Sequence, residues 1–385
     1  MVMRIGDSER STPNERNWHV LTIEMLPASH GDCLWLEYGT ASRIQRVLID
    51  GGPAYSYDAL AKRLEARLGS LPEEERRFEL LIITHVDSDH IGGILEFLLA
   101  HPLAITVGDV WFNGWDHLPG AAPDVLGAVQ GEQVSALLKG RFPWNTAFGR
   151  NAVVVPETGD LPTVKLRGGL TLTLLSPTTK ELRKLRPKWK KTVEEAGMAA
   201  GSAEDALAKL REKGRELPPD ILGEASPDPR ALAMQPFKPD TSVANGSSIA
   251  VLAEYRNRSC LLAGDALAGV VAGSVTRLAQ ERGTTRLGVG ALKLSHHGGK
   301  SNTSSELLNL LRCQRYLFST DGSRFQHPDL QSVARTIMVA GQGTSLFFNY
   351  RTEINEVWDD RVLKREFGYE TVFPEDDQEG MVVEL

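Results

Sequence analysis

One short stretch of the chain holds four side chains that can bind metal ions. Residues 85–90 read His-Val-Asp-Ser-Asp-His, so two imidazoles and two carboxylates fall within six positions. Imidazole nitrogen combined with carboxylate oxygen suits zinc, manganese or iron better than calcium or magnesium. In an extended chain alternate side chains point the same way, and the last two ligands follow a turn. The pattern therefore predicts two neighbouring metal sites, one built on His85 and Asp87 and the other on Asp89 and His90.

The elements around this stretch have to place it at the edge of a sheet. Leu80 to Ile83 is a short apolar run with the length of a buried strand. Ile94 to Leu99 favours the start of a helix, and Gly92 and Gly93 before it would allow a tight bend beside the ions. Loops between a strand end and a helix are where α/β proteins place binding sites. Helix capping would explain the two aspartates but not the two histidines.

The spacing of these ligands resembles the loop of the metallo-β-lactamase fold, which reads His-x-His-x-Asp-His. Here Asp87 stands at the place of the second histidine. The His-x-Asp-x-Asp-His version resembles the branch that contains the hydrolase domain of ComEC/Rec2 competence proteins and the phosphorylcholine esterases. The resemblance implies an α/β fold in four layers, an αββα sandwich of two mixed sheets, here with a helical insertion.

Two aspartates after predicted strands resemble other motifs of this superfamily. Asp50 opens an Asp-Gly-Gly turn after the strand 46–49, and Asp265 stands in Ala-Gly-Asp-Ala after a predicted hairpin. Each of them alone would suit an ordinary turn. The resemblance implies that Asp50 orients the ligand loop through hydrogen bonds without touching a metal, and that Asp265 bridges both metals.

A pair of histidines follows the predicted strand 290–295, in the order His296-His297-Gly-Gly. The pair resembles the His-His-Gly-Ser motif of the ComEC branch. The resemblance implies that one histidine completes the shell of the second metal, and that the other serves the first metal or stabilises an oxyanion. We expect His297 to join Asp89 and His90, but the sequence alone does not order the two histidines.

The same resemblance places two further residues near the reacting groups. Asn245 lies where other superfamily members supply a third histidine, and this chain has no histidine between positions 118 and 295. An asparagine there could orient the substrate or a water molecule. His327 stands in a His-Pro step that resembles the end of the ComEC-type site, although Gln326 replaces the usual glycine. We expect His327 to protonate the leaving group or contact phosphate, and Asp89 to be essential for turnover.

The implied chemistry is hydrolysis assisted by two divalent metal ions, zinc or manganese. Two ions can lower the pKa of water from ~15.7 towards about 7 and stabilise the charge of an ester transition state. Asp87 in place of a histidine makes the first site harder, which favours manganese. The resemblance points to a phosphodiesterase or nuclease acting on nucleic acid or nucleotide diesters. Hydrolysis of another ester, a lactone, a thioester or an amide stays open, as does a non-catalytic binding scaffold.

The bulk composition sets limits on partners and compartment. The 385-residue chain has a formal charge of −7 and a pI of about 5.8, so it has no overall basic footprint for nucleic acid. Cys33, Cys260 and Cys313 are far apart and form no Cys-x-x-Cys pair, which favours a reducing compartment, the cytoplasm. No run reaches the length of a transmembrane helix, so we expect no membrane partner.

The organisation of the chain follows from changes in composition. We expect a flexible leader without an apolar signal core at 1–17, and the two halves of the metallo-β-lactamase-like domain at 18–177 and 241–351. Between the halves, 178–240 is a charged insertion of helix and loop, forming an arm or lid. The C-terminal extension, 352–385, ends in an acidic tail that we expect to be peripheral.

The start of the insertion has an unusual charge pattern. Thr179 to Lys191 carries seven lysines or arginines and one acid, with Trp189 in the run. Such a run could contact phosphates and stack a nucleobase, and it could equally be a solvated helix face. Because the insertion leads into the second half of the site, it could also gate substrate access, or mediate a homodimer or a partner contact.

Overall fold

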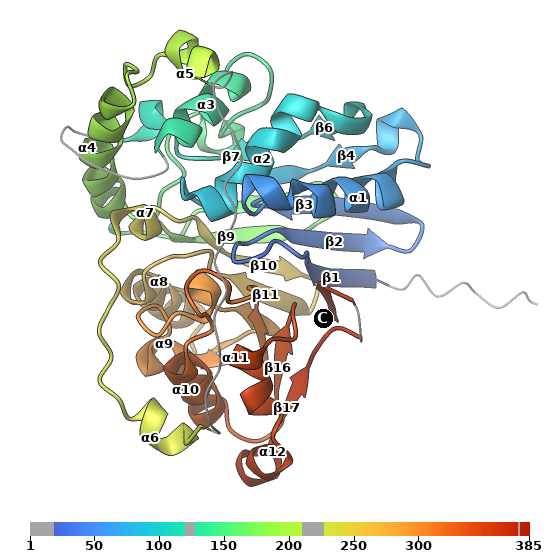
Figure 1. Cartoon of the computed structure of the whole chain (residues 1–385), viewed down its shortest axis with the longest axis vertical. Helices are drawn as coiled ribbons and strands as arrows, with labels where there is room; N and C mark the ends of the chain where they lie inside the picture. The colour runs from blue at the N-terminus through green and yellow to red at the C-terminus, as the bar shows by residue number, and fades with distance from the viewer. Residues whose placement is uncertain (1–18, 120–127, 210–226, 376–377) are drawn as a thin grey trace, which may run out of the picture.

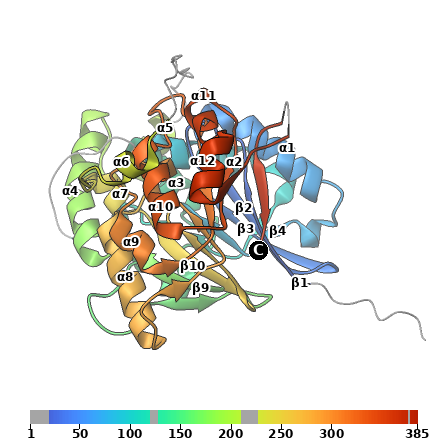
Figure 2. The ribbon, with the colours of Figure 1, turned by 90° about the horizontal axis from the view of Figure 1, so that it is seen from below.

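Two sheets lie face to face and helices cover their outer sides (Figures 1 and 2). The computed structural model describes residues 19–119, 128–209, 227–375 and 378–385. In Figure 2 the helices α1 and α8 lie on opposite sides of the strands. The four-layer αββα sandwich with two mixed sheets is therefore confirmed.

The first sheet has the strand order β18-β1-β2-β3-β5-β7. Strands β1, β2 and β3 are antiparallel, and β3, β5 and β7 are parallel. The parallel part brings the carboxyl ends of β3 and β5 to the same edge. The strands are β1 (His19–Met25), β2 (Leu34–Thr40), β3 (Arg43–Ile49), β5 (Leu80–Ile82), β7 (Val110–Trp111) and β18 (Met381–Glu384).

The second sheet has the order β17-β16-β15-β13-β11-β10-β9-β8. Strands β8 to β11 are antiparallel neighbours, and the run from β11 through β13, β15 and β16 to β17 is parallel. Its strands are β8 (Thr163–Lys165), β9 (Thr171–Ser176), β10 (Ala250–Tyr255), β11 (Arg258–Leu262), β13 (Ala291–Lys293), β15 (Arg315–Phe318), β16 (Thr344–Phe348) and β17 (Tyr369–Val372). Two small ladders join β4 (Arg77–Phe78) to β6 (Thr106–Val107) and β12 (Leu287–Gly288) to β14 (Leu311–Arg312).

The helices divide between the two outer faces. Apolar side chains of α1 to α5 pack on the first sheet, and those of α8 to α10 pack on the second. No helix among the described residues combines the length and apolar character needed to span a bilayer. The helices are α1 (Tyr57–Leu68), α2 (Ser88–Ala100), α3 (Ala128–Leu138), α4 (Thr179–Glu195), α5 (Ala203–Lys209), α6 (Pro229–Ala233), α7 (Val243–Gly246), α8 (Ala268–Glu281), α9 (Ser305–Asn309), α10 (Leu330–Ala340), α11 (Glu353–Glu356) and α12 (Arg361–Phe367). Short 3₁₀ turns lie at Ala54–Ser56, Glu73–Glu75, Pro102–Ala104, Trp115–His117, Thr146–Phe148, Ser295–Gly298 and Val357–Asp359.

Strand β2 shows how the sequence separates the two cores. Leu34, Leu36 and Tyr38 are buried in the cluster between the sheets. Trp35 belongs to the other cluster, between the first sheet and its helices. Because successive side chains of a strand point to opposite faces, this alternation requires both faces of the sheet to be covered.

Helix α2 starts at Ser88, earlier than predicted, and the expected bend at Gly92 and Gly93 is wrong. Both glycines lie inside the helix. A Cβ at Gly93 would lie 1.9 Å from the carbonyl oxygen of Gly51, and the backbone nitrogen of Gly93 donates to the carbonyl of Gly52 at 2.7 Å. The glycines therefore let the helix touch the Asp-Gly-Gly turn, which fixes the ligand loop against that turn.

The C-terminal tail is not peripheral, which corrects the prediction. Strand β18 pairs antiparallel with β1 at the edge of the first sheet, and β17 pairs with β16 in the second. Met381 and Val383 are buried in the core between the sheets. Burial alternates along Met-Val-Val-Glu, with Met381 and Val383 buried and Val382 and Glu384 exposed, which suits an edge strand with one buried face.

Helix α4 is packed against the body of the protein. Its buried residues Leu182, Leu185, Trp189 and Val193 follow a helical repeat and join the core of the first half. The Trp189 side chain is fully buried, and its indole nitrogen donates to Glu132 Oε1 at 2.7 Å. The prediction that Trp189 could stack a nucleobase is therefore wrong. Residues 210–226 of the predicted insertion lie outside the described residues.

Candidate metal centre

Four strand ends bring the predicted ligands to one edge of the sandwich. Asp50 follows β3 and His85 follows β5 in the first sheet, while Asp265 follows β11 and His297 lies just beyond β13 in the second. The hydrogen bond from the His296 backbone nitrogen to the Gly264 carbonyl, at 3.0 Å, ties the last two loops together. Segments distant in sequence thus build one site between the sheets.

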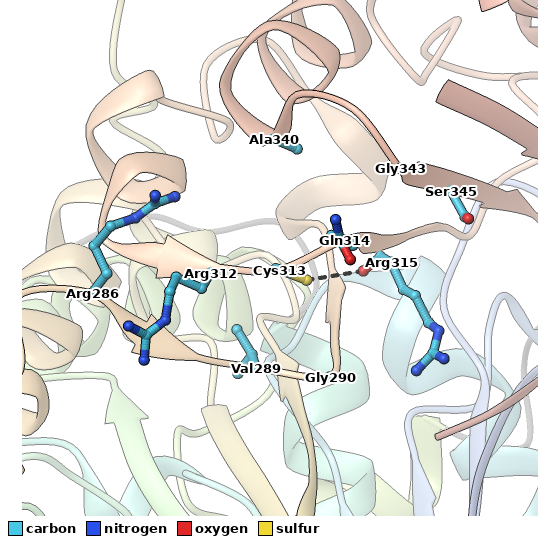
Figure 3. A pocket seen from close by; sticks show the side chains of 10 residues that line it. All are labelled: Arg286, Val289, Gly290, Arg312, Cys313, Gln314, Arg315, Ala340, Gly343 and Ser345. Carbon is cyan, nitrogen blue, oxygen red and sulfur yellow. Dashed lines mark hydrogen bonds between the residues drawn. The ribbon is translucent and has the colours of Figure 1, made fainter. Parts of the chain in front are cut away.

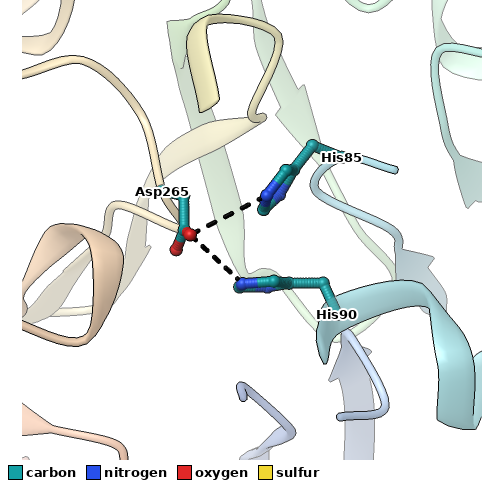
Figure 4. Close-up of side chains that lie close together, drawn as sticks. All are labelled: His85, His90 and Asp265. Carbon is teal, nitrogen blue, oxygen red and sulfur yellow. Dashed lines mark ion pairs between the residues drawn. The ribbon is translucent and has the colours of Figure 1, made fainter. Parts of the chain in front are cut away.

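The Asp265 carboxylate lies at the middle of the site. Its Oδ2 atom is 3.3 Å from His90 Nε2 and 3.8 Å from His85 Nε2. Figure 4 shows these two imidazoles pointing at the carboxylate from the opposite side. The same oxygen is 3.8 Å from Nε2 of His296 and 3.8 Å from Nε2 of His297. An oxygen that faces four imidazole nitrogens supports the predicted bridging position of Asp265.

The ligand atoms fall into overlapping groups. Those of Asp89, His90 and His297 lie within 4.8 Å of one another, and so do those of His85, His90 and Asp265. His297 Nε2 is 3.5 Å from Asp89 Oδ2, so His297 lies beside the two ligands with which it was expected to join. Both groups are buried, as a metal site with several protein ligands requires.

Asp87 lies at the border of the site. Its Oδ2 is 3.6 Å from His85 Nε2, and the side chain is 32% exposed. Asp87 occupies the N-cap position of α2, but its side chain makes no capping hydrogen bond. The carboxylate is therefore free to face His85, although Asp87 belongs to none of the close ligand groups found in the described residues.

Asp50 makes hydrogen bonds to the ligand loop, as expected for a residue that orients the ligands without binding a metal. Its carboxylate accepts hydrogen bonds from the Thr84 backbone nitrogen at 2.8 Å and the Thr84 hydroxyl at 2.7 Å. Its Oδ2 lies 2.8 Å from His90 Nδ1, and Thr84 Oγ1 lies 3.0 Å from His85 Nδ1. With their Nδ1 atoms engaged, both imidazoles turn Nε2 towards the centre.

Two residues that are not among the predicted site residues support the other side of the centre. His297 Nδ1 lies 2.9 Å from the Ser319 carbonyl oxygen and 3.3 Å from Asp32 Oδ1. Lys293 forms an ion pair with Asp32, and both side chains are fully buried. A lysine in the apolar strand before the histidine pair, and an aspartate in the turn between β1 and β2, were the available signals. Their meeting depends on tertiary structure.

A test of metal fit comes from atoms without hydrogen-bond partners. The Nε2 atoms of His85, His90 and His297 and Oδ1 of Asp265 are buried and make no hydrogen bond. Leaving a buried polar atom unsatisfied costs about 1–3 kcal/mol, so such atoms are uncommon. Divalent cations would satisfy these four atoms, because all four face the same place. The residues therefore fit the divalent metal ions that the superfamily uses.

The electrostatics of the site favour positive charge. Burial alone would lower the pKa of His90, but the carboxylates of Asp265 and Asp50 raise it well above the ordinary value. Burial opposes charge on His297 as well, yet Asp32 and Asp265 raise its pKa to about 9. Burial raises the pKa of Asp265, and the surrounding imidazoles hold that pKa well below its usual range. The Asp265 carboxylate therefore stays ionised at neutral pH and attracts cations.

The remaining predicted residues line the mouth of the site. The Asn245 side-chain nitrogen, in α7, donates to Asp240 Oδ2 at 2.7 Å and lies 3.3 Å from His296 Nδ1. The His296 side chain is 26% exposed, so it reaches solvent. The His327 ring lies 5.2 Å from the His296 ring, and its Nδ1 is 3.4 Å from Asp329 Oδ2. The structure thus brings all three predicted residues together around the partly exposed His296, with Asn245 itself buried.

A separate cavity of about 570 Å³ lies at the other end of the second sheet (Figure 3). It lies at the amino ends of β13, β15 and β16, whereas the candidate ligands follow the carboxyl ends of β11 and β13. None of the candidate ligands lines it. The lining residues are Arg286, Val289, Gly290, Arg312, Cys313, Gln314, Arg315, Ala340, Gly343 and Ser345.

Comparison with known families agrees with this geometry. Residues 36–165 match the family model described as "Metallo-beta-lactamase superfamily". The matched stretch contains Asp50 and the ligand loop 85–90. Over this stretch, which is about a third of the chain, the sequence is similar to the metallo-β-lactamase superfamily, and the four-layer fold agrees with that. Members of the superfamily are typically metal-dependent enzymes, and the candidate metal groups of this chain accord with that. No curated protein matches the chain significantly.

Several solved structures show remote similarity. YhfI, a metallo-β-lactamase fold protein from Bacillus subtilis, is 11% identical with a TM-score of 0.39, covering 95% of this chain and 100% of that protein. Zn²⁺-bound PqqB from Methylobacterium extorquens is 11% identical with a TM-score of 0.40, covering 91% and 87%. CmlA, a diiron β-hydroxylase from Streptomyces venezuelae, is 14% identical with a TM-score of 0.37, covering 96% of this chain. The chain spans 54% of the length of CmlA.

Proposed function

We propose that this protein is a metal-dependent phosphodiesterase that acts on the diesters of nucleic acids or nucleotides. The observation that carries the proposal is the set of buried imidazole nitrogens and carboxylate oxygens without hydrogen-bond partners, which face one place beneath a mouth lined by histidine and asparagine. The choice of phosphodiesters rests on the His-x-Asp-x-Asp-His order, which resembles the ComEC branch. The Arg324 guanidinium, which lies close enough to His30 to act on its charge, suits an anionic substrate.

Two ions would be held by the side chains that the structure gathers. One ion would be held by His85 and Asp265, with Asp87 beside them, and the other by Asp89, His90 and His297 with Asp265. His90 can serve only one ion, because its Nδ1 faces Asp50 and Nε2 alone is free. When bound, divalent ions lower the pKa of water and offset the negative charge that develops on the phosphate. The Asp265 carboxylate, which faces both groups, would fix the distance between them.

The contacts of His296 support a role as a ligand. Asn302 donates through its side-chain nitrogen to Asp240 at 2.9 Å, so its Oδ1 faces His296 Nδ1 at 3.1 Å. The Asn245 side-chain nitrogen, which can only donate, lies 3.3 Å from the same Nδ1, so the two asparagines hold the ring in place without fixing its tautomer. The His296 Nε2 faces Asp265 Oδ2 at 3.8 Å, which supports the use of His296 as a ligand of the first ion, with His327 as the candidate proton donor.

The test is a substrate panel on protein of known metal content. Elemental analysis of the purified protein, then of protein stripped and reloaded with zinc or manganese, would give the metal and its stoichiometry. We expect hydrolysis of bis-p-nitrophenyl phosphate that disappears with a chelator, returns with the metal and is absent in Asp89→Ala. Preferential hydrolysis of a lactone or a thioester would contradict the phosphodiesterase assignment. Absence of all turnover in metal-loaded protein would favour a binding scaffold.

A further inference from the structure

One exposed aromatic ring lies at the mouth of the candidate metal centre. Phe325 is 49% exposed, and it is the only aromatic residue among the exposed large hydrophobic side chains of the described residues. Full burial of a phenylalanine side chain is worth roughly 1.5–3 kcal/mol, so exposing half of one has a cost. A ring exposed beside the candidate metal centre is therefore a candidate for contact with substrate.

The position of Phe325 is defined by three histidines. Its ring centroid lies 6.0 Å from that of His327, 6.1 Å from that of His30 and 6.5 Å from that of His296. His296 in turn faces Asp265, with 3.8 Å between Nε2 and the carboxylate oxygen. A group bonded to a phosphate at the metal centre would therefore extend towards the Phe325 ring.

The loop that carries Phe325 is held in place. The Ser29 hydroxyl donates to Asp321 Oδ2 at 2.6 Å, and the Ser323 backbone nitrogen donates to Asp321 Oδ1 at 2.9 Å. The Gln326 backbone nitrogen donates to the Gly322 carbonyl at 3.0 Å. These bonds on both sides of the ring fix the backbone, so little ordering would be needed when substrate binds.

The positive charge of Arg324 limits which substrate groups can bind against the Phe325 ring. Its guanidinium carbon lies 5.2 Å from the Phe325 centroid, and Arg324 forms no ion pair in the part of the chain that the structure describes. An aromatic ring alone could attract a quaternary ammonium group such as choline. A guanidinium beside that ring repels a cationic head group but attracts phosphate, and a neutral nucleobase can still stack.

We propose that Phe325 stacks on a nucleobase next to the scissile phosphate and that Arg324 contacts a phosphate of the same substrate. This proposal rests on the proposed phosphodiesterase function and narrows its substrates to nucleotide diesters. The ring selects the substituent that carries a base, and the guanidinium selects against cationic alcohols. Phe325 is thus a specificity-determining residue, and the ligands at the centre supply the chemistry.

Three esters with the same leaving group test the proposal. Thymidine 5′-(p-nitrophenyl phosphate), methyl p-nitrophenyl phosphate and p-nitrophenylphosphorylcholine all release p-nitrophenolate, so ratios of kcat/KM report the other substituent. We expect wild type to prefer the thymidine ester. Phe325→Ala and Phe325→Leu should lower the thymidine-to-methyl ratio by roughly 5- to 100-fold, the scale of one base–aromatic stack, and Phe325→Trp should retain it. Met338→Ala, at another exposed apolar residue, is the matched control and should leave the ratio unchanged.

The outcomes separate the two proposals. If metal-loaded wild type hydrolyses none of the three esters, the phosphodiesterase function itself fails. If wild type hydrolyses them but Phe325→Ala and Phe325→Leu keep the thymidine-to-methyl ratio, the function stands and the stacking proposal is overturned. A preference of wild type for the choline ester would overturn it too. We further expect Arg324→Gln to raise the rate on the choline ester relative to the methyl ester, and no change would contradict the charge argument.

Discussion

The two ends of the second sheet carry polar side chains in opposite settings. At the carboxyl ends of β11 and β13, imidazoles and carboxylates are buried and several of their atoms lack hydrogen-bond partners. At the amino ends of β13, β15 and β16, Arg286, Arg312 and Arg315 border a cavity of about 570 Å³ and are exposed to solvent (Figure 3). The first end has buried polar atoms without hydrogen-bond partners, and the second has a cavity bordered by hydrated charge.

The difference shows why volume is a poor guide to chemistry here. An exposed guanidinium keeps its water, so its position needs no further compensation. A buried imidazole nitrogen without a partner is costly, and four polar atoms in that state need a common compensating charge. The carboxyl end therefore carries evidence of a bound cation, while the amino end carries none. Substitutions should have large effects at the first end and small effects at the second.

Removal of the central carboxylate should have the largest effect. In Asp265→Ala the oxygen that faces four imidazoles is gone, so metal content should fall and kcat/KM for bis-p-nitrophenyl phosphate should drop by at least roughly 10²- to 10³-fold. Elemental analysis and steady-state kinetics check this, with Asp58→Ala in the exposed face of α1 as the control. If the variant keeps the metal content and turnover of wild type, Asp265 does not bind metal, and the proposed contrast between the two ends of the sheet is wrong.

Loss of the supporting carboxylate should have a smaller effect. Asp50→Asn keeps the shape but weakens the bond to His90 Nδ1 and the two bonds from Thr84, so both histidines of the loop become less well oriented. We expect metal affinity to fall by roughly 10- to 100-fold, as for other residues that orient metal ligands. Competition with a chromogenic chelator measures it. If affinity is unchanged, Asp50 serves the turn alone.

Basic residues near the active edge should affect polymeric substrates. Lys180, Arg183 and Lys184 are exposed on α4, whose first turn packs near α7: a Cβ at Gly246 would lie 3.4 Å from Glu181 Cγ. We expect Lys180→Glu, Arg183→Glu and Lys184→Glu together to raise KM for single-stranded DNA by roughly tenfold at low salt. The effect should vanish near about 0.5 M salt, where charges are screened within about 4 Å.

The far end of the same helix supplies a control for this prediction. Lys190 and Lys191 pair with Glu194 and Glu195 at 3.6 Å each, and in the first set Lys184 pairs with Glu181 at 3.8 Å. The two sets therefore differ mainly in their distance from α7, which lies near the start of α4. Lys190→Glu with Lys191→Glu should raise KM for DNA much less than the triple variant. Equal effects would mean that overall charge, and not a path leading to the site, governs binding.

The parts of the site that could be predicted from sequence are those with local spacing. His85 to His90 lie within six positions and the histidine pair is adjacent, so their chemistry is visible without a fold. The apolar run Leu80 to Ile83 was expected to form a strand, and β5 spans Leu80–Ile82 in the structure. These features depend on interactions within a few residues, which sequence patterns record directly.

What sequence could not give depends on contacts between distant segments. Lys293 meets Asp32 across 261 positions, and Phe325 meets His30 only when the two sheets face each other. The apolar repeat also missed the start of α2, because its first turn consists of polar residues that face the site. The basic run around Trp189 concealed the apolar face that buries this residue.

Substitutions at the cavity should have the smallest effect on turnover. Arg312 and Arg315 contact none of the candidate ligands, and they lie at the amino ends of strands whose carboxyl side holds the site. We expect Arg312→Ala with Arg315→Ala to keep kcat/KM for the thymidine and methyl esters within about twofold, the ordinary scale for surface substitutions of ±0.5 kcal/mol. A loss comparable to that of Asp50→Asn would mean that the cavity is coupled to the site.

The reactivity of the Cys313 thiol, which lines this cavity, gives a second and independent test of whether Arg312 and Arg315 affect a buried group. Burial raises the pKa of Cys313 to about 12, and the nearby Arg315 lowers it only in part. Because the folded pKa lies above that of a free thiol, Cys313 stays protonated near pH 8, and its reactivity should rise only as pH approaches 12. Alkylation by iodoacetamide, followed by mass spectrometry between about pH 7 and 9.5, should show slow labelling in wild type and in Arg312→Ala with Arg315→Ala alike. Fast labelling near pH 8 that the double variant abolishes would show that these charges act on a buried group, and the contrast between the two ends would fail.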